Sequence, residues 1–506
     1  MHYDFFRLNE LPEAAAQFKI PPPPHPYKWS DNVWIAENGD WLALYRPLNL
    51  GLIFFHRKYF TGSPHSLWNY VPDRMLDRMI TERFLIPHIE DMDTLEHNRL
   101  IEDAREGTFR FICVIPTNAC DMKCAYCHQR PPKSKEAAMT LAEIESGLDK
   151  CARLCDDAAK PVDILLYGGE PLNAFHITEK ILKLTEKSRG LFKSEVRLSF
   201  TTSGLGMTSE RAETLARRNV FVIVSIDGPP ECNDKVRIAP NRESAFSEAE
   251  KAYFLLKECG CRTGLSVTIG RHNIHKFTRN LEYLLDRFPA NDIGLNAFLH
   301  PLDSRPNPFQ ASWEEAFRAF TEGFIITTEY GLYAEQPFRR LKPFVFRQPL
   351  LKDCSSPGER LVLTPGGKLG FCDSCYPENR YFYPLDSFPG RDNPDYQLWA
   401  GLSSPEMPFC RECPAMTVCG GACRFDAYKA SGKLDGVDPQ RCKFEIALLY
   451  WMIWRLFDCI SDINEPYFFP EESDRKLLFR NVVLDSDNQP FTAGSYSDTK
   501  NLTKNI

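Results

Sequence analysis

Apolar residues gather in short, nearly continuous runs through the middle of the chain, and segments with helical periodicity separate these runs. The six runs are FRFICVIP, VDILLYGG, EVRLSFTTS, FVIVSID, GLSVTIG and DIGLNAFL, and TLAEIESGLDKCARLC is one of the helical segments between them. Strands that alternate with helices in this way form a parallel sheet covered by helices. The pattern predicts an α/β fold, a partial (β/α)6 TIM-like barrel, with its functional residues at the carboxyl ends of the strands.

The flanking segments have other patterns. VWIAENGDWLALYRP places two strand-like runs around a hairpin signal at Asn38-Gly39-Asp40, and SLWNYVPDRMLDRMITERFLI has helical spacing. Together they predict a small N-terminal β+α module. WEEAFRAFTEGFIITTEYG predicts a helix near 313–331. IALLYWMIWRLF, from Ile446 to Phe457, predicts a buried helix that is too short to span a bilayer.

Shifts in composition complete the expected organisation. The proline-rich IPPPPHPYKWS does not propagate a helix or a central strand. The region from Cys354 to Cys442 is rich in Cys, Gly and Pro, and the end, SYSDTKNLTKNI, has few apolar residues to bury. The expected parts are a tail and linker at 1–30, the module at 31–105, the barrel at 106–310, a helical connector at 311–350, a C-terminal Cys-rich iron-sulfur domain at 351–445, and a helix with a polar tail at 446–506.

Charge and cysteine content limit the classes of function that the chain could have. A net charge of -7 gives no overall positive field for a nucleic acid, so we expect no nucleic-acid partner. The start of the chain lacks the basic and apolar segments of a secretory signal, which predicts a cytoplasmic protein with no membrane partner. In that reducing compartment the 18 cysteines are expected to serve metal binding or catalysis rather than disulfides.

Three cysteines follow directly after the first predicted barrel strand, in CDMKCAYC, as Cys120, Cys124 and Cys127. A cubane iron-sulfur cluster has four irons and usually four thiolates. Three thiolates therefore leave one iron open for an exchangeable ligand. A zinc site and three unrelated loop thiols are the alternatives, and only His128, which adjoins Cys127, offers a fourth zinc ligand at short spacing.

These residues resemble the CxxxCxΦC signature of radical S-adenosylmethionine (SAM) enzymes, with Tyr126 in the aromatic position. YGGEP, after the second predicted strand, is similar to the GGE motif of that family. The resemblance implies that Gly168, Gly169 and Glu170 contact the amino group of SAM. It also implies the cleavage of SAM by an electron from the reduced cluster, and a 5'-deoxyadenosyl radical that removes a hydrogen atom from a substrate.

TTSG and SIDGP, at the ends of the third and fourth predicted strands, also resemble family positions. They imply contacts with the methionine or ribose part of SAM. The residues concerned are Ser203, Ser225, Asp227 and Arg237. The family often has Asn where Ser203 stands. A simple turn at Asp227-Gly228-Pro229 and a solvated Arg237 remain as alternatives.

CRECPAMTVCGGAC sets four cysteines at the spacing C-x2-C-x5-C-x3-C. Seven C-terminal cysteines match the SPASM extension of radical SAM enzymes, which implies two auxiliary clusters and three 4Fe-4S clusters in all. The implied ligands are Cys410, Cys413, Cys419 and Cys442 for one cluster, and Cys354, Cys372 and Cys423 for the other. The second set is one short, and Cys375 or a substrate thiolate is expected to complete it. A zinc ribbon is the alternative.

Enzymes with both parts mostly modify peptides or proteins. The resemblance therefore implies a maturase that crosslinks or otherwise oxidises a ribosomally made peptide, with flavodoxin or ferredoxin as the electron donor. Asp373 aligns with an acid thought to act as a base in anaerobic sulfatase maturases, and a solvated loop residue is its alternative. A formylglycine-generating enzyme and an iron-sulfur carrier are the other functions considered.

The module at 31–105 is weakly similar to the leader-binding domains attached to such maturases. A sheet edge in the module can bind an extended leader peptide by strand addition. A cap that only packs on the barrel is the alternative for the same segment.

Overall fold

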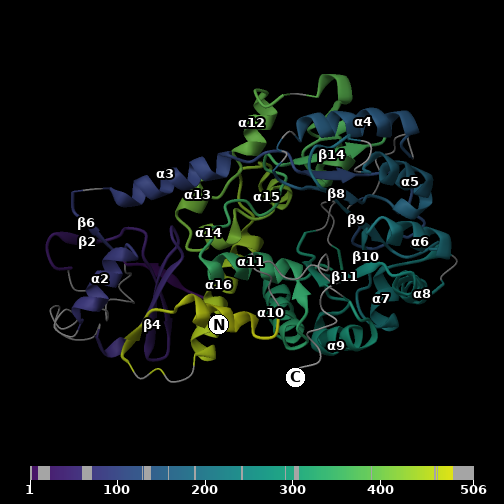
Figure 1. The fold of residues 1–506 in the computed structure, drawn as a ribbon. Coiled ribbons are helices and arrows are strands. Elements are labelled where there is room, and N and C mark those ends of the chain that lie inside the picture. Colours follow the sequence, from purple (N-terminus) through teal and green to yellow (C-terminus); the bar gives the residue numbers. More distant parts are fainter. Residues whose placement is uncertain are drawn as a thin grey trace. The chain divides into compact units, whose positions relative to one another are not determined.

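The computed structural model of the chain (Figure 1) falls into two compact units. The first unit contains residues 1–106, 338–354 and 402–480, and the second contains 107–337, 355–401 and 481–506. The structure describes residues 3–8, 23–59, 71–89, 91–127, 129, 138–155, 157, 159–186, 190–240, 243–290, 292–300, 307–388, 390–460, 463 and 465–482. His128 and the end SYSDTKNLTKNI lie outside these ranges.

The second unit is built on a sheet of ten strands, in the order β13-β12-β11-β10-β9-β8-β7-β14-β15-β16. The central strands are β7 (Phe111–Val114), β8 (Val162–Leu166), β9 (Val196–Thr202), β10 (Phe221–Ser225), β11 (Arg262–Ile269) and β12 (Asp292–Ala297). They are parallel and lie in sequence order. The predicted α/β partial barrel of six β–α units is therefore confirmed.

The outer strands extend this sheet at both edges. β13 (Tyr333–Ala334) pairs in parallel with β12. At the other edge β14 (Arg360–Thr364) pairs in parallel with β7. Two antiparallel strands, β15 (Lys368–Gly370) and β16 (Phe382–Pro384), follow β14. The first part of the predicted Cys-rich region thus continues the barrel sheet.

Helices cover the barrel strands, as the alternating pattern predicted. They are α4 (Leu141–Leu154), α5 (Phe175–Leu184), α6 (Ser209–Arg217), α7 (Pro230–Val236), α8 (Ala245–Glu258), α9 (Phe277–Arg287) and α10 (Trp313–Glu329). Figure 1 shows α4, α5, α6 and α8 on the outer side of strands β8 to β11. The start of α4 is fixed by a capping box between Thr140 and Glu143, which satisfies otherwise unpaired backbone N–H groups.

Strand register brings the loops after the strands to one edge. Val114 pairs with Leu166, Leu166 with Phe200, and Phe200 with Val222, and all four side chains are fully buried. Because the strands are parallel and these residues are level, the segments that follow them leave the sheet on the same side. This is the edge at which the predicted cofactor-binding loops lie.

The first unit contains an antiparallel sheet in the order β1-β3-β4-β5-β17. The strands are β1 (Phe5–Arg7), β3 (Trp34–Asn38), β4 (Trp41–Arg46), β5 (Gly51–His56) and β17 (Tyr467–Phe468). The predicted hairpin between β3 and β4 is confirmed, and Gly39 adopts a φ of 58° in its turn.

The outermost strands of this sheet differ from the sequence expectation. Residues expected in a tail and linker form β1, which pairs with β3. Residues expected in a polar tail form β17, which pairs with β5. The physical reason is aromatic packing, because the ring of Phe468 stacks on Phe54 with 4.8 Å between their centroids. β1 and β17 thus form the two edges of the sheet, although both strands are too short to show an alternation of apolar and polar residues.

Helices pack around the same unit. They include α2 (Asp73–Thr81), α3 (Met92–Arg105), α15 (Arg424–Ser431) and α16 (Pro439–Cys459). The buried helix predicted from IALLYWMIWRLF is the second half of α16, and its Trp454 and Phe457 rings contact Phe54. Among the described residues, no helix is both long and apolar enough to cross a membrane.

Candidate functional site

The three-cysteine loop leaves the carboxyl end of β7. Its backbone is fixed by Lys123 N–H, which donates to Ile238 O at 2.9 Å, and by Ala125 N–H, which donates to Val236 O at 2.8 Å. Cys120 is exposed, whereas Cys124 and Cys127 are half-buried. The loop therefore has a fixed backbone and presents three thiols.

The charges of these thiols act on one another. Desolvation raises the pKa of Cys120 to about 12 and that of Cys124 to about 11, and the neighbouring thiols add to both shifts. Thiols held this close would ionise only with a positive partner, and a bound metal deprotonates a coordinating thiol. The donor set therefore fits an iron-sulfur cluster that has three protein ligands.

The segment Gly168-Gly169-Glu170 lies against this loop at the end of β8. Gly169 N–H donates to Thr117 O at 3.1 Å, and Glu170 N–H donates to Ala119 O at 2.9 Å. A Cβ atom on Gly169 would lie 2.5 Å from the carbonyl oxygen of Ala119, so a side chain has no room there. The Gly-Gly-Glu segment is thus in direct backbone contact with the residues that immediately precede Cys120.

Glu170 is turned toward the end of β9. Its buried carboxylate accepts hydrogen bonds from Ser203 N–H at 2.8 Å, Ser203 Oγ at 2.6 Å and Thr202 Oγ1 at 2.7 Å. Burial raises the pKa of Glu170, and these donors oppose the rise. The structure therefore brings the predicted residues Glu170 and Ser203 together, and it adds Thr202, which the motifs did not identify.

Asp227 lies at the centre of a buried polar cluster after β10. Its carboxylate accepts from Arg237 Nε at 3.0 Å and Nη2 at 3.2 Å, and from Thr268 N–H at 2.8 Å. The hydroxyl of Tyr126 donates to the same carboxylate. Burial by itself would raise the pKa of Asp227, but Arg237 and His272 together outweigh it and hold the pKa well below its usual range. Arg237 is only 8% exposed, so the alternative of a solvated charge is wrong.

His272 is a member of this cluster that sequence reasoning missed. Its ring stacks against Tyr126 at 5.9 Å, and its Nε2 lies 3.6 Å from Asp227 Oδ2. It is buried and follows β11 by three positions, so its place after a barrel strand was the available signal. Ser225 ends β10 and is 9% exposed.

Asp373 begins the short 3-10 helix η7 (Asp373–Glu378), directly after Cys372. Arg360 of β14 donates from Nη1 to Asp373 Oδ1 at 2.7 Å. Gln129, two positions after Cys127, approaches the other carboxylate oxygen at 3.4 Å. Asp373 is therefore ion-paired rather than a solvated loop residue, and Arg360 and Gln129 are partners that the motifs did not reveal.

The cysteines next to Asp373 form a pair. The hydrogen bond between the thiols of Cys372 and Cys375, together with burial, raises the pKa of Cys372 well above its usual range. Cys375 N–H also donates to Cys372 O at 3.1 Å. Cys375, the candidate for the missing ligand, thus lies beside one of the predicted ligands. These two residues belong to the second unit, whereas Cys354 and Cys423 belong to the first.

In the first unit the other predicted ligand set comes together. The charges of Cys410 and Cys442 act on Cys413, and that of Cys410 acts on Cys419. Burial raises the pKa of Cys413 and that of Cys442 to about 12. The structure therefore groups these four cysteines, although they are spread over more than thirty positions of the chain.

Within the part of the chain that the structure describes, no three Cys, His, Asp or Glu side chains form a group able to hold one metal ion. A mononuclear zinc site requires four ligands at about 2.0–2.3 Å from a single ion. A cubane instead carries its thiolates on separate irons.

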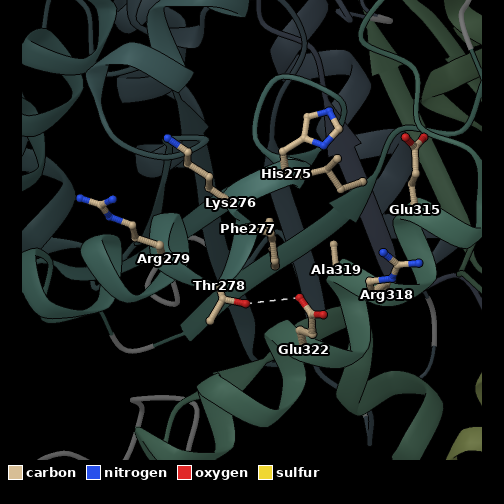
Figure 2. Close-up of a pocket in the computed structure, with 10 residues that line it drawn as sticks. His275, Lys276, Phe277, Thr278, Arg279, Glu315, Arg318, Ala319 and Glu322 are labelled. Atoms are coloured by element: carbon tan, nitrogen blue, oxygen red, sulfur yellow. Dashed lines mark hydrogen bonds between the residues drawn. The ribbon is translucent and has the colours of Figure 1, made fainter.

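A pocket of about 500 Å³ lies between the short 3-10 helix η6 (Ile274–Lys276), the first turn of α9, and α10 (Figure 2). Its charged lining residues are His275, Lys276, Arg279, Glu315, Arg318 and Glu322. Figure 2 shows the Thr278 hydroxyl directed at Glu322, to which it donates at 3.3 Å. None of the predicted site residues lines this pocket, so it is separate from the cysteine loop.

Residues 114–284 match the Radical SAM superfamily, and these residues run from the end of β7 through most of α9. The cysteine loop, the Gly-Gly-Glu segment and the Asp227 cluster all lie within the match. The chain therefore contains a radical SAM domain.

Two curated relatives are similar over most of their length. The radical SAM cyclopropyl synthase TigE of Paramaledivibacter caminithermalis is 23% identical over 391 residues, which cover 72% of this chain and 79% of that protein. The PqqA peptide cyclase of Granulibacter bethesdensis is 24% identical over 349 residues, which cover 64% of this chain and 84% of that protein. The similarity to both relatives extends beyond the residues of the radical SAM match.

Solved structures share the fold. The structure of anSMEcpe with bound AdoMet has a TM-score of 0.58 and 16% identity, and covers 69% of this chain and 100% of its own. SuiB of Streptococcus suis bound to precursor peptide SuiA has a TM-score of 0.50 and 14% identity, and covers 81% of this chain and 100% of its own. These similarities establish the architecture.

Proposed function

We propose that this protein is a radical SAM maturase that removes a hydrogen atom from a side chain of a ribosomally made peptide or protein. The modification would be a thioether or carbon–carbon crosslink or a related oxidation. The contact of the cysteine loop with Gly169 and Glu170, at the carboxyl ends of parallel strands, is the observation that carries this proposal. The names of the relatives, a cyclopropyl synthase and a peptide cyclase, support a peptide substrate.

In this proposal Cys120, Cys124 and Cys127 would hold a 4Fe-4S cluster whose open iron binds SAM. The bound cluster and SAM supply the one-electron chemistry that removes the substrate hydrogen atom. Glu170 would accept a hydrogen bond from the amino group of SAM, with Ser203 fixing its carboxylate. Tyr126 would face the cofactor, held in position by its hydrogen bond to Asp227.

A second set of residues would complete the oxidation. Loss of a hydrogen atom followed by loss of an electron leaves a substrate that must also lose a proton. Asp373 would accept this proton, and Arg360 and Gln129 would hold its carboxylate in place.

The C-terminal cysteines would hold two auxiliary clusters in a SPASM-like domain, which carry the substrate electron away. Cys410, Cys413, Cys419 and Cys442 support one of these clusters because the structure groups them in one unit. The pairing of Cys372 with Cys375 supports Cys375 as a ligand of the other. Flavodoxin or ferredoxin would supply the electron for SAM cleavage, and the cytoplasm would be the compartment.

The N-terminal sheet would bind the leader segment of the substrate by strand addition. Strands β3, β4 and β5 each have two neighbours in the described sheet, so an added strand would have to pair with β1 or β17. A leader bound in this way would therefore pair with β1 or β17 rather than with the central hairpin.

Formylglycine generation is the second candidate. The observation that favours it is Asp373, which is held by Arg360 in the second unit, in a fold shared with anSMEcpe. A cysteine substrate would lose the same hydrogen atom, electron and proton to give a thioaldehyde, and water would then replace the sulfur, which leaves as hydrogen sulfide. An iron-sulfur carrier is disfavoured because it needs neither Glu170 nor the barrel around it.

The proposal is tested with anaerobically reconstituted full-length protein. We expect reductive cleavage of SAM to 5'-deoxyadenosine, and we expect this activity to be lost in Cys124→Ala. Cys259→Ala serves as the matched control because this half-buried cysteine lies outside all predicted ligand sets. Protein that contains zinc and no iron, or that does not cleave SAM, would contradict the proposal.

Mass spectrometry of peptides co-expressed with the protein then identifies the modification. A loss of two hydrogens in a crosslink supports the peptide maturase, whereas conversion of a cysteine to formylglycine supports the second candidate. Asp373→Asn should retain SAM cleavage and lose peptide product by at least tenfold. Asp392→Asn, at an exposed aspartate, is the matched control and should retain both activities.

A further inference from the structure

Arg424 is a buried arginine at the first position of α15, directly after Cys423. Its side chain is held by carbonyl oxygens. Nη1 donates to Leu434 O at 3.1 Å and to Gly436 O at 3.2 Å, and Nε donates to Ala422 O at 3.2 Å. The residue is only 5% exposed. In the described part of the chain no carboxylate forms an ion pair or hydrogen bond with it.

Carbonyl oxygens satisfy the N–H groups of a guanidinium but carry no net charge. A buried cation without a counter-charge is costly, often by several kcal/mol. Arg424 Nη1 also donates to the thioether sulfur of Met407 at 2.9 Å, and Met407 O accepts a hydrogen bond from Cys410 N–H at 2.9 Å. Nη2 donates to Gly421 O, two positions after Cys419. The guanidinium therefore lies against the two backbone segments that carry the predicted cluster ligands Cys410 and Cys419.

Another buried arginine near the same cysteines has a different environment. Arg340 donates to Glu445 from Nε at 2.9 Å, and its Nη2 lies 2.6 Å from Asp353 Oδ1. Its charge is therefore already compensated by two carboxylates. Arg424 differs because its described partners are carbonyl oxygens and a thioether sulfur.

We propose that Arg424 is the buried counter-cation of the iron-sulfur cluster held by Cys410, Cys413, Cys419 and Cys442, and that its charge raises the reduction potential of this cluster. The inference rests on the proposed auxiliary cluster. Reduction adds one negative charge to a cluster, so a fixed cation beside its ligands stabilises the reduced form. Arg424 would thus favour the transfer of the substrate electron to this cluster.

The test uses the full chain with Cys120, Cys124 and Cys127 changed to Ala, so that the SAM-binding cluster is absent. The cluster of interest is the one whose electron paramagnetic resonance signal disappears in Cys413→Ala. Potentiometric titration followed by this resonance gives the midpoint potential of that cluster. In Arg424→Gln we expect this cluster to be retained and its reduced-to-oxidised ratio at a fixed potential to fall about tenfold, which is 59 mV for one electron. Arg424→Lys keeps the charge and should retain the potential of the parent.

The matched control is Arg475→Gln. Arg475 is a second buried arginine held by carbonyl oxygens, those of Phe344 at 2.7 Å and Leu50 at 2.9 Å. The charged groups acting on it are Arg347, Tyr45, Glu82 and Arg78, with no cysteine among them. Its removal should lower the melting temperature and leave the cluster potential unchanged.

The outcomes separate the two proposals. A parent protein without any cluster that depends on Cys413 would contradict the auxiliary cluster itself. A parent with the cluster, and an Arg424→Gln variant with the same midpoint potential, would overturn only the role of Arg424. Loss of the cluster in both Arg424→Gln and Arg424→Lys would also overturn that role, because it would make Arg424 a structural contact between two loops.

Discussion

The hydroxyl group of Tyr126 donates a hydrogen bond to the carboxylate of Asp227, and this bond joins the three-cysteine loop to the end of β10. The guanidinium of Arg237 lies 5.5 Å from the centre of the Tyr126 ring and also binds Asp227. One tyrosine is therefore fixed by both its hydroxyl and its ring. Because Tyr126 adjoins Cys127, the position of a predicted cluster ligand depends on a contact made more than a hundred residues away.

Changing Tyr126 to Phe removes the hydroxyl and leaves the ring. We expect the cluster to be retained and the affinity for SAM to fall about tenfold, since a hydrogen bond to a charged group contributes roughly 1.5–3 kcal/mol. Isothermal titration under anaerobic conditions measures this change. Tyr330→Phe is the matched control, because the Tyr330 hydroxyl donates to Asp286 at 2.7 Å on the exposed surface. Equal SAM affinity in both variants would contradict the role of the Tyr126 hydroxyl.

Changing Glu170 to Gln tests the carboxylate at the end of β8. The amide NH2 group would replace one carboxylate oxygen and so face the donor of either Ser203 or Thr202, and we expect SAM cleavage to fall at least a hundredfold. Ser203→Ala removes a single donor from the same carboxylate and should have a smaller effect. SAM cleavage is measured as the rate of 5'-deoxyadenosine release. A Ser203→Ala variant less active than Glu170→Gln would be inconsistent with this arrangement.

Asp292 gives the second unit a pH dependence at the start of β12. Burial raises its pKa to about 7, and Glu335 adds to the shift. The folded state therefore keeps a proton that the unfolded chain has already lost near pH 4. Stability consequently falls as the pH rises from about 4 to 7, by up to about 4 kcal/mol.

The variant Asp292→Asn has no ionisable group at this position. We expect the melting temperature of the variant, relative to the wild type, to be higher at pH 8 than at pH 5, because the wild type loses stability between these pH values and the variant does not. Thermal unfolding of the reconstituted protein at both pH values gives the comparison. The same difference between variant and wild type at both pH values would show that Asp292 does not titrate in this range.

Changing Phe468 to Ala tests the contribution of β17 to the first unit. The ring stacks on Phe54 and lies 6.1 Å from Phe457, so we expect a loss of about 2–4 kcal/mol of stability. Faster cleavage of the N-terminal sheet in limited proteolysis is the expected result. Phe409→Ala is the matched control, because Phe409 is 57% exposed. Equal cleavage rates in both variants would mean that β17 does not stabilise the sheet.

Much of the fold follows from local sequence patterns. The alternation of apolar runs with helical segments predicted β7 to β12 in their order, because each strand must bury both faces between helices. The hairpin around Gly39 and helix α16 were likewise visible as short-range signals. The strands β1 and β17 were not, because two or three residues cannot display a period and their aromatic side chains find partners far along the chain.

The sequence by itself determined which residues are proposed to carry the chemistry, since the spacing of Cys120, Cys124 and Cys127 and the glycines before Glu170 are local features. Only the tertiary structure decided which groups surround them. The contacts of Tyr126 with Asp227, and of Arg360 with Asp373, join side chains whose separation along the chain follows no period. The same holds for the proposed role of Arg424, whose described partners include carbonyl oxygens and a thioether sulfur. Charge compensation in a buried site depends on three-dimensional neighbours, and these neighbours are fixed by packing.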